Sequence, residues 1–348
     1  MAFTVLDICT GAGGEAIGLE AAGFELAAAV EIDAAACATL RLNRPHWHVI
    51  EGDVRQVDGR EFRGIDLLAA GVPCPPFSIA GKQLGAEDER DLFPEVLRLI
   101  EQSRPRAVLL ENVRGLATAK FDMYRNNLIH GLRRLSYDVD WKVLNASAYS
   151  VPQLRPRFVL VAMPYALLER FQWPEQKAEP PTVGDTIGDL MAERGWLGAD
   201  AWRENANTIA PTIVGGSMKH GGPDLGPTRA KKQWEALGVD GHGLAALPPG
   251  ADDPIDKRPR LTVRMAARIQ GFPDTWAFSG KKTSAYRQVG NAFPPPFAQA
   301  MGEAIYTLLT EQAAVGEQYQ SLVPIFGGAK EDRQWHTSRD ARDRRSVS

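Results

Sequence analysis

The start of the chain constrains its fold more than any other stretch. Residues 3–8 are an apolar run typical of a strand, residues 9–14 form a glycine-rich turn, and residues 15–22 have a helical composition that Gly23 is expected to end. A strand, a glycine turn and a helix in this order are typical of a nucleotide-type binding site. The glycines would let a ligand approach the backbone, and the helix N-terminus offers free N–H groups. Taken alone, the turn is also compatible with a simple tight connection.

Acidic residues in the following segments favour a nucleoside ligand. Residues 27–33 form a second apolar strand that ends in acids, and Glu31 lies about 20 residues after the glycine turn, as expected of an acid that binds ribose hydroxyls. Asp53 closes the next apolar stretch, where it could reach the exocyclic amine of a base. Because no GxxxxGK[ST] phosphate-binding motif occurs, a nucleoside triphosphate is not expected.

A cysteine follows a third apolar run. Residues 66–70 predict a buried strand, and Cys74 comes after it between prolines that fix the backbone. The carboxyl end of a strand is the usual place for chemistry in an open α/β sheet, although a lone loop cysteine more often packs as a small hydrophobe. Residues 107–110 predict another buried strand, which brings Glu111 to the same sheet edge. A buried carboxylate there is costly unless it has a partner or a task.

Two arginines precede a further strand. Arg155 and Arg157 lie two residues apart at the start of the apolar run 158–162, so their side chains point to the same face. They form either a solvated edge or, opposite an anionic or carbonyl-bearing substrate, a pair of clamps. The region from 174 to 260 is rich in proline and glycine, with little helical periodicity. Within it, residues 205–234 carry more basic than acidic side chains, which predicts a basic side on a loop-built domain.

Composition excludes several classes of protein. The 348 residues are 44% hydrophobic and 24% charged, as in a globular protein with a sizeable core. A net charge of −3 means that nucleic-acid binding would require a local basic face. Three scattered cysteines indicate neither a disulfide framework nor a zinc cluster, which favours a reducing compartment. Neither a signal peptide nor an apolar stretch of membrane-spanning length is apparent.

Taken together and in this order, the motifs resemble those of the bacterial DNA (cytosine-5) methyltransferases. The resemblance covers nearly the whole chain except the variable segment, which lies where that family keeps its target-recognition domain, and the tail. The matching motifs are the glycine turn at 7–14, Glu31, Asp53, the Pro73-Cys74 loop, residues 111–113, Gln153 with Arg155 and Arg157, residues 270–273, and Gly290-Asn291.

The resemblance implies a fold and a domain organisation. We expect an α/β, Rossmann-like S-adenosylmethionine-dependent methyltransferase domain with a mostly parallel twisted sheet, and a smaller, irregular, loop-rich target-recognition domain. The catalytic and cofactor-binding domain would span 1–165, the target-recognition domain 166–270, and a return to the catalytic domain with a final helix 271–326. That helix is expected from Phe297 to Leu309, and residues 327–348 are expected to be a disordered tail.

The resemblance also implies the chemistry. Cys74, as a thiolate, would add to carbon-6 of a flipped cytosine, so that carbon-5 becomes reactive toward the methyl donor. Arg155 would lower the pKa of the thiol, and Arg157 would bind the carbonyl oxygen of the base. Glu111, protonated and buried, would hold ring nitrogen-3 and the exocyclic amine. No residue is an obvious base for the carbon-5 proton, and an ordered water is a candidate.

Cofactor and DNA contacts follow from the same resemblance. The donor would be S-adenosyl-L-methionine, converted to S-adenosyl-L-homocysteine, with no metal. Residues 78–89 would close behind the flipped base. The predicted DNA contacts are Ser78, Lys82 and Thr212 on phosphates, and Lys219, His220 and Arg229, within 205–243, on base edges. The predicted cofactor pocket comprises Asp7, Cys9, Gly11, Gly13, Gly14, Glu31, Ile32, Asp53, Val54, Pro73, Leu92, Asn291 and Ala292.

Some positions depart from the family's pattern. Members often have Phe at the position of Cys9 and an aromatic or bulky residue at that of Ile32, so the adenine would be held more loosely here. Members commonly have Gln after the nucleophile, where this chain has Pro75, so another loop residue would fill the space that the flipped base leaves. Members often have Glu where Met265 stands, a difference that we interpret as structural.

Other functions stay open from the sequence. An RNA cytosine-5 methyltransferase would have the same motifs but a shorter recognition region, and the long glycine-rich insert here favours duplex DNA. A catalytically silent DNA-binding relative would lack part of the set Cys74, Glu111, Arg155 and Arg157, which is complete. A dinucleotide-binding oxidoreductase does not explain the Pro-Cys loop. Amino-methyltransferases of DNA need Asp or Asn where Cys74 stands.

The expected setting is the bacterial cytoplasm and nucleoid. The protein would act on double-stranded DNA as a monomer, with no membrane association. It would belong to a restriction-modification system, with a cognate endonuclease acting separately, or act as an orphan methylase. The sequence does not decide between these two settings or specify the DNA site that is read.

Overall fold

The structure is a computed structural model that describes residues 2–73, 91–176, 179–215 and 224–322, with side chains described up to residue 314. The chain divides into two compact units, Met1–Leu309 and Thr310–Ser348. Every element described below lies in the first unit, except the end of the last helix.

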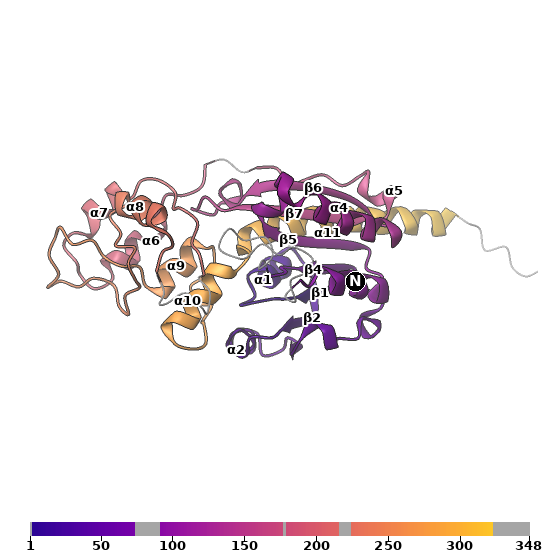
Figure 1. Ribbon diagram of the computed structural model, residues 1–348, viewed down its shortest axis with the longest axis horizontal. Coiled ribbons are helices and arrows are strands. Elements are labelled where there is room, and N and C mark those ends of the chain that lie inside the picture. The colour runs from indigo at the N-terminus through magenta and orange to yellow at the C-terminus, as the bar shows by residue number, and fades with distance from the viewer. Residues whose placement is uncertain (1, 74–90, 177–178, 216–223, 323–348) are drawn as a thin grey trace, which may run out of the picture. The chain divides into compact units, whose positions relative to one another are not determined.

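Seven strands form one mixed sheet in the order β3-β2-β1-β4-β5-β7-β6 (Figure 1). The first five strands along the chain pair in parallel, whereas β7 runs antiparallel to both β5 and β6. Chain order reverses between β1 and β4, and the crevice at such a switch point is where open α/β sheets bind ligands. The strands are β1 (Thr4–Ile8), β2 (Glu25–Glu31), β3 (Val49–Glu51), β4 (Leu67–Ala70), β5 (Ala107–Val113), β6 (Asp138–Asn145) and β7 (Pro156–Met163).

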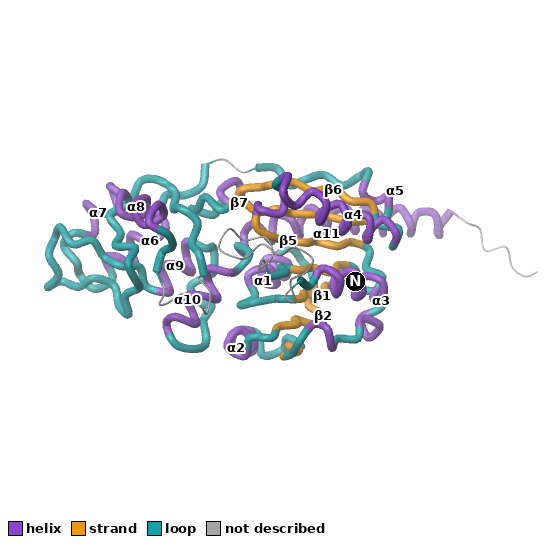
Figure 2. The backbone as a smooth tube through the Cα atoms, in the orientation of Figure 1, coloured by secondary structure: helices purple, strands orange, loops and turns teal. Residues whose placement is uncertain are grey.

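Helices cover both faces of the sheet (Figure 2), which explains why its inner strands are mostly apolar. Successive side chains of a strand point to opposite faces. Leu6 therefore packs in one cluster with α3 and α4, and Val5 in another with α1 and α11. The helices of this part are α1 (Gly14–Ala21), α2 (Ala34–Asn43), α3 (Phe93–Ser103), α4 (Asp122–Arg134), α5 (Tyr165–Leu168) and α11 (Pro295–Leu322).

The proline- and glycine-rich region contains helices that its sequence did not predict: α6 (Val183–Ala192), α7 (Ala199–Asn205) and α8 (Thr228–Ala236). Together with α9 (Val263–Ile269) and α10 (Lys282–Asn291) they enclose a core in which Trp196, Trp202 and Trp234 are buried. The glycines that suggested loops are contact points, because a Cβ on Gly184 would lie 2.2 Å from the carbonyl oxygen of Arg203. Their small size lets α6 and α7 approach closely.

Met265, which departs from the family pattern, lies in the first turn of α9 and contacts its N-cap. Thr262 is the N-cap, and its side chain accepts a hydrogen bond from the Met265 amide at 3.2 Å. The sulfur of Met265 accepts in turn from the Thr262 amide at 3.4 Å. In a capping box this second bond usually goes to Glu or Gln, so Met265 takes the place of a carboxylate with a buried thioether.

The last helix is longer than predicted. It begins at Pro295 and continues to Leu322, beyond the expected limits of Phe297 and Leu309. Proline suits the first turn of a helix because its missing N–H would have no helical partner there. The tail after 322 lies outside the described residues. Within the described part of the chain, no helix is long and apolar enough to span a membrane.

Candidate active site

The glycine turn connects β1 to α1, and its glycines have different functions. Gly13 has φ 88°, and a Cβ on it would lie 2.7 Å from Leu40 Cδ2. A Cβ on Gly14 would lie 2.3 Å from the carbonyl oxygen of Phe293. These two glycines therefore allow the protein to pack against itself, rather than leave room for a ligand. Only open space surrounds the Cβ position of Gly11, at φ 57°, so it alone among the three has room for a ligand there.

Glu31 ends β2 as predicted and is almost fully buried. Its carboxylate accepts hydrogen bonds from the backbone amides of Gly11 at 2.7 Å, Ile32 at 2.9 Å and Asp33 at 2.7 Å. Burial raises the pKa of Glu31, and these three amides oppose the rise. A carboxylate has about four acceptor positions, so one remains for a hydroxyl donor. Glu31 thus also fixes the glycine turn against the second strand.

The side chains next to Glu31 suit an adenosine. Ile32 is 69% exposed at the carboxyl end of β2, where an apolar side chain gains from covering a flat base. Asp53 caps the turn that begins at Val54, and the hydrogen bonds from Arg55 lower the pKa of Asp53. An ionised Asp53 is therefore an acceptor suited to an exocyclic amine. Ile32, the ribose-type acid Glu31 and the open side of Gly11 together fit the adenosine part of S-adenosylmethionine.

The remaining predicted cofactor residues differ in exposure. Pro73 and Asn291 are exposed, Cys9 and Leu92 are half-buried, and Ala292 is buried. Asp7 is fully buried, and Val54 is mostly buried. Cys9 adopts φ 57°, a left-handed conformation that is unusual for a residue other than glycine, and such strain tends to occur at functional sites.

Glu111 and Arg157 form a buried ion pair. Arg157 Nε lies 2.6 Å from Glu111 Oε1, and each side chain is 11% exposed. Antiparallel pairing of β5 with β7 aligns Arg157 with Val113, two residues from Glu111 on the same face. Burial raises the pKa of Glu111, and Arg157 and Arg155 oppose the rise. The pair thus holds a carboxyl group and a guanidinium together at the adjoining ends of β5 and β7.

Arg155 is a buried clamp on backbone carbonyls. It is 1% exposed, and its Nη atoms donate to the carbonyl oxygens of Ile213 at 2.7 Å, Gly290 at 2.8 Å and Ala292 at 2.9 Å. Its Nε has no hydrogen-bond partner within the described ranges. Arg155 thus joins the start of β7, the loop-rich region and the end of α10, a function that its spacing from Arg157 did not predict.

Asn112, from the motif at 111–113, links β5 to the residues that follow β4. Its Nδ2 donates to the carbonyl oxygen of Val72 at 3.3 Å, and its Oδ1 accepts from the amide of Val113. The end of β5 is thereby tied to the chain that leaves β4. Cys74 itself, like Ser78, Lys82, Lys219 and His220, lies outside the described residues.

Two buried acids lie between the glycine turn and Glu111. Asp7, in β1, is 0% exposed, and Glu15, in the first turn of α1, is 3% exposed. Burial is the largest cause that raises the pKa of each. The next cause is the charge of Glu31 for Asp7 and the charge of Asp7 for Glu15. Sequence reasoning missed Glu15 because an acid in the first turn of a helix is ordinary. Its burial depends on β4 and β5, which come later in the chain.

The predicted DNA contacts that the structure describes lie in the loop-rich region. The Thr212 hydroxyl donates to the carbonyl oxygen of Leu154 at 2.5 Å, and Arg229 is exposed on α8. Lys231, on the same helix, pairs with Asp224 at 2.8 Å, so part of the basic character is neutralised. Arg229 therefore stays the better described candidate for DNA.

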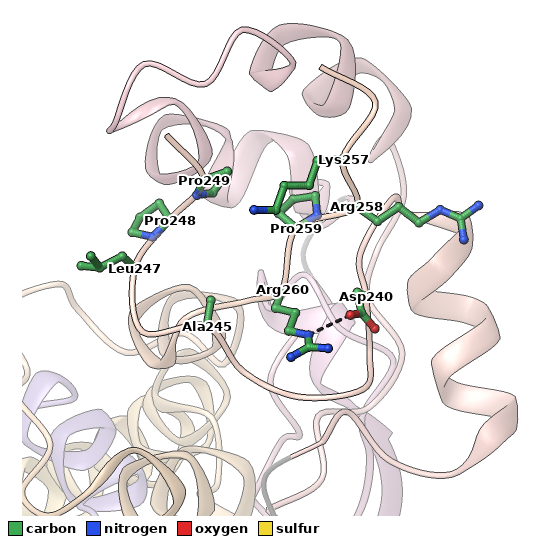
Figure 3. A pocket seen from close by; sticks show the side chains of 9 residues that line it. All are labelled: Asp240, Ala245, Leu247, Pro248, Pro249, Lys257, Arg258, Pro259 and Arg260. Atoms are coloured by element: carbon green, nitrogen blue, oxygen red, sulfur yellow. Dashed lines mark hydrogen bonds and ion pairs between the residues drawn. The ribbon is translucent and has the colours of Figure 1, made fainter. Parts of the chain in front are cut away.

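A cavity of about 340 Å³ lies beside this region (Figure 3). Arg260 points across it to Asp240 and binds that carboxylate at 2.7 Å. Lys257 and Arg258, which also line it, pair with Asp253 and Glu235. Its cations are thus engaged, and the cavity offers less free charge to a phosphate than its composition suggests.

The chain is similar to known DNA methylases along most of its length. The family model described as C-5 cytosine-specific DNA methylase matches residues 3–307. Type II methyltransferase M.NaeI of Lentzea aerocolonigenes is 52% identical over 344 residues, covering 96% of this chain and 83% of that one. Type II methyltransferase M.NgoMIV of Neisseria gonorrhoeae is 51% identical over 320 residues, covering 90% and 100%.

Solved structures show the same fold. The crystal structure of a Spodoptera frugiperda DNMT2 mutant matches with a TM-score of 0.63 and 17% identity, covering 88% of this chain and 100% of that one. At this identity the likeness concerns the fold, which agrees with the predicted Rossmann-like methyltransferase domain.

Proposed function

The chain belongs to the C-5 cytosine-specific DNA methylase family and is a DNA (cytosine-5) methyltransferase, and from this premise we propose how its residues act. The substrate is a cytosine flipped out of a specific duplex DNA site. The observation that carries the proposal is the buried pair of Glu111 and Arg157 toward the end of β5, next to Asn112, which donates to the carbonyl oxygen of Val72.

S-adenosylmethionine supplies the methyl group when bound. Glu31 would hold the ribose hydroxyls, Asp53 the exocyclic amine and Ile32 one face of the adenine, with Gly11 giving room at the turn. This is supported by the buried carboxylate of Glu31, the exposed apolar surface of Ile32 and the open space at Gly11. Cys9, Val54, Pro73, Leu92, Asn291 and Ala292 would complete the pocket.

Cys74 would be the nucleophile, because carbon-5 of cytosine is a poor nucleophile unaided. The thiolate adds to carbon-6, forming a carbon–sulfur bond, and the electrons of the 5,6 double bond become available at carbon-5. After carbon-5 has gained the methyl group, its proton leaves to a base, for which an ordered water is our candidate. The double bond then re-forms, and the carbon–sulfur bond breaks to return the thiolate.

Glu111 and Arg157 would hold the base while charge develops on it. A protonated Glu111 donates to nitrogen-3 and accepts from the exocyclic amine, and burial supports this protonation because it raises the pKa of Glu111. Arg157 would donate from its guanidinium to the carbonyl oxygen of the base. Arg155 would act on the Cys74 thiolate through its charge, since its Nη atoms are engaged by carbonyl oxygens.

DNA would be read by the loop-rich region. We assign residues 166–270 to target recognition and 271–326 to a return to the catalytic domain. The core around Trp196, Trp202 and Trp234 also includes Leu40 and Trp47, so the two parts would share a packed interface. Arg229, Lys219 and His220 would contact base edges, and Ser78, Lys82 and Thr212 phosphates, with residues 78–89 closing behind the flipped base.

The biological setting is inferred from the relatives. Because the two relatives described above are Type II methyltransferases, we propose that the protein acts in restriction-modification, with a separate cognate endonuclease. It would bind DNA as a monomer in the cytoplasm and nucleoid. No metal is required by the proposed chemistry.

The experiment that tests the function is bisulfite sequencing of DNA from a host that expresses the protein, together with methyl incorporation into duplex DNA and transfer RNA in vitro. We expect protected cytosines at one recurring sequence and incorporation into DNA. Incorporation into transfer RNA alone would replace duplex DNA as the substrate, and no incorporation into either would contradict the catalytic assignment.

A further inference from the structure

Glu15 is a buried carboxyl to which the methyl-transfer scheme above gives no task. It is 3% exposed, and its Oε1 has no hydrogen-bond partner in the part of the chain that the structure describes. A buried carboxylate is costly unless it is paired or functional. Its position in the first turn of α1 favours a negative charge only modestly, so the helix alone does not explain it.

Glu15 faces Glu111 across the backbone of Gly71. A Cβ placed on Gly71 would lie 3.6 Å from Glu15 Oε2, 3.9 Å from Glu111 Oε2 and 3.8 Å from the carbonyl oxygen of Cys9. Three oxygens therefore lie within 4 Å of one point beside Gly71, an arrangement that a single water molecule could bridge. A water donates only two hydrogens, so all three oxygens are satisfied only when one of the carboxyls carries a proton.

The surrounding groups also favour a proton on one of the two carboxyls, Glu15 or Glu111. The negative charge of Asp7, from β1, raises the pKa of Glu15, and the negative charge of Glu31 raises the pKa of Asp7. Arg157 and Arg155, from the β7 side, face Glu111 and favour its ionised form. Burial nevertheless raises the pKa of both Glu15 and Glu111. Two carboxyls that share a buried site do not both ionise easily, so the pair keeps a proton that a lone Glu111 beside Arg157 would lose more readily.

We propose that Glu15 is a positioning residue for methyl transfer, which shares a proton with Glu111 and so keeps Glu111 able to donate to nitrogen-3 of the cytosine. The inference rests on the function proposed for Glu111. Glu15 touches neither the base nor the nucleophile in this scheme. Its effect is on the protonation state of its neighbour, and its substitution should therefore change the pH dependence of the reaction as well as its rate.

The test is the single-turnover rate of methyl transfer to duplex DNA between about pH 6 and pH 9.5, at saturating cofactor, for wild type, Glu15→Gln and Glu15→Leu. Both variants remove the like charge beside Glu111. We expect the alkaline decline of the rate to move to lower pH by about one unit. Glu25→Gln, on an exposed position of β2, is the matched control and should follow the wild type. Thermal unfolding identifies a variant that has not folded.

Two further measurements keep the outcomes distinct. Calorimetric titration with S-adenosylmethionine should give affinities within about twofold of wild type, because Glu15 is not assigned to the cofactor. An unshifted profile in both folded variants overturns the inference, as does weakened cofactor binding with an unshifted profile. The Glu111→Gln variant distinguishes failure of the function proposed for Glu111 from failure of the proposed proton sharing with Glu15. A wild-type rate in that variant removes the proposed function of Glu111 itself, whereas a slow Glu111→Gln with unshifted Glu15 variants removes only the shared proton.

Discussion

The side-chain amide of Gln153 donates a 2.7 Å hydrogen bond to Oε1 of Gln270, although 117 residues separate them in the sequence. Gln270 in turn donates to the carbonyl oxygen of Ala292 at 2.6 Å, and Oε1 of Gln153 accepts from the amide of Ile213 at 2.8 Å. Both glutamines are fully buried. Three motifs that are far apart in the chain are thus joined by one hydrogen-bonded chain, next to the carbonyls that Arg155 holds.

This chain of hydrogen bonds should contribute to the free energy of unfolding. Gln153→Leu leaves Gln270 and the Ile213 amide buried without their partner, so the free energy of unfolding in urea should fall by about 2–3 kcal/mol. Replacing both glutamines with leucine should cost less than the sum of the single changes, because neither glutamine is then left buried opposite an apolar partner. Gln299→Leu, which removes a half-exposed pair with Glu303 on α11, is the control. A loss below about 0.5 kcal/mol for Gln153→Leu would refute the argument.

Cys74→Ala should abolish methyl transfer while binding to the target DNA survives. The two cysteines that the structure describes are poor candidates for a thiolate. Burial raises the pKa of Cys37 to about 11 and that of Cys9 further above its usual range. Cys37→Ala is therefore the control and should retain transfer. Methyl transfer is measured by incorporation of labelled methyl groups, and DNA binding by a gel-shift titration. Full methylation by Cys74→Ala would contradict the proposed role of Cys74 as nucleophile.

Ile32→Ala should weaken binding of S-adenosylmethionine by about fivefold, since part of a contact worth about 1.5–3 kcal/mol is lost. The side chain is 69% exposed, so the free energy of unfolding of the apoprotein should stay unchanged. Leu42→Ala on α2, at a position that is 59% exposed, matches the change without touching the proposed site. Calorimetric titration measures the affinity. Equal affinities for the two variants would remove Ile32 from the cofactor site.

Asp7 should make the apoprotein less stable at alkaline pH. Burial, with the charge of Glu31, raises its folded-state pKa well above 3.8. The folded state therefore holds the proton more tightly than the unfolded state, so the stabilisation is complete below about pH 3.8 and is lost as pH rises through the folded pKa. Within that window the slope is about 1.4 kcal/mol per pH unit. Asp7→Asn should reduce the dependence of the free energy of unfolding on pH, measured by urea titrations between about pH 5 and pH 9. Asp252→Asn, at an exposed position, should not reduce it.

The sequence predicted best what depends on local pattern. Apolar runs before Glu31, Asp53 and Glu111 located β2, β3 and β5 because buried parallel strands are continuous and apolar, although β3 ends at Glu51 and β5 continues to Val113. It predicted less well what depends on distant partners. The environment of Gly13 is set by Leu40 and Trp276, so this glycine, which suggested ligand approach, is instead a packing contact.

The functions of Arg155 and Arg157 likewise depend on residues that are distant in the sequence. Spacing predicted that Arg155 and Arg157 share a face, and charge suggested two clamps on a substrate. Only contacts from segments far along the chain reveal that Arg155 is occupied by carbonyl oxygens while Arg157 faces Glu111. Helices α6, α7 and α8 were missed because each is short, and glycines at their contacts resemble loop glycines in a sequence.

The pair of Glu111 and Arg157 gives the last prediction, in which rate and stability should separate. In Glu111→Gln the amide oxygen still accepts from Arg157, so the free energy of unfolding should fall by only about 1–2 kcal/mol. The neutral amide cannot give a proton toward nitrogen-3 as charge develops, so the single-turnover rate should fall by about 10²–10³-fold. Arg157→Met leaves Glu111 buried without its cation and should cost about 3 kcal/mol or more. Asp138→Asn, which breaks an exposed pair with Arg133, should change neither quantity measurably. If the rate of Glu111→Gln falls no further than its lost stability accounts for, the carboxyl is structural rather than catalytic.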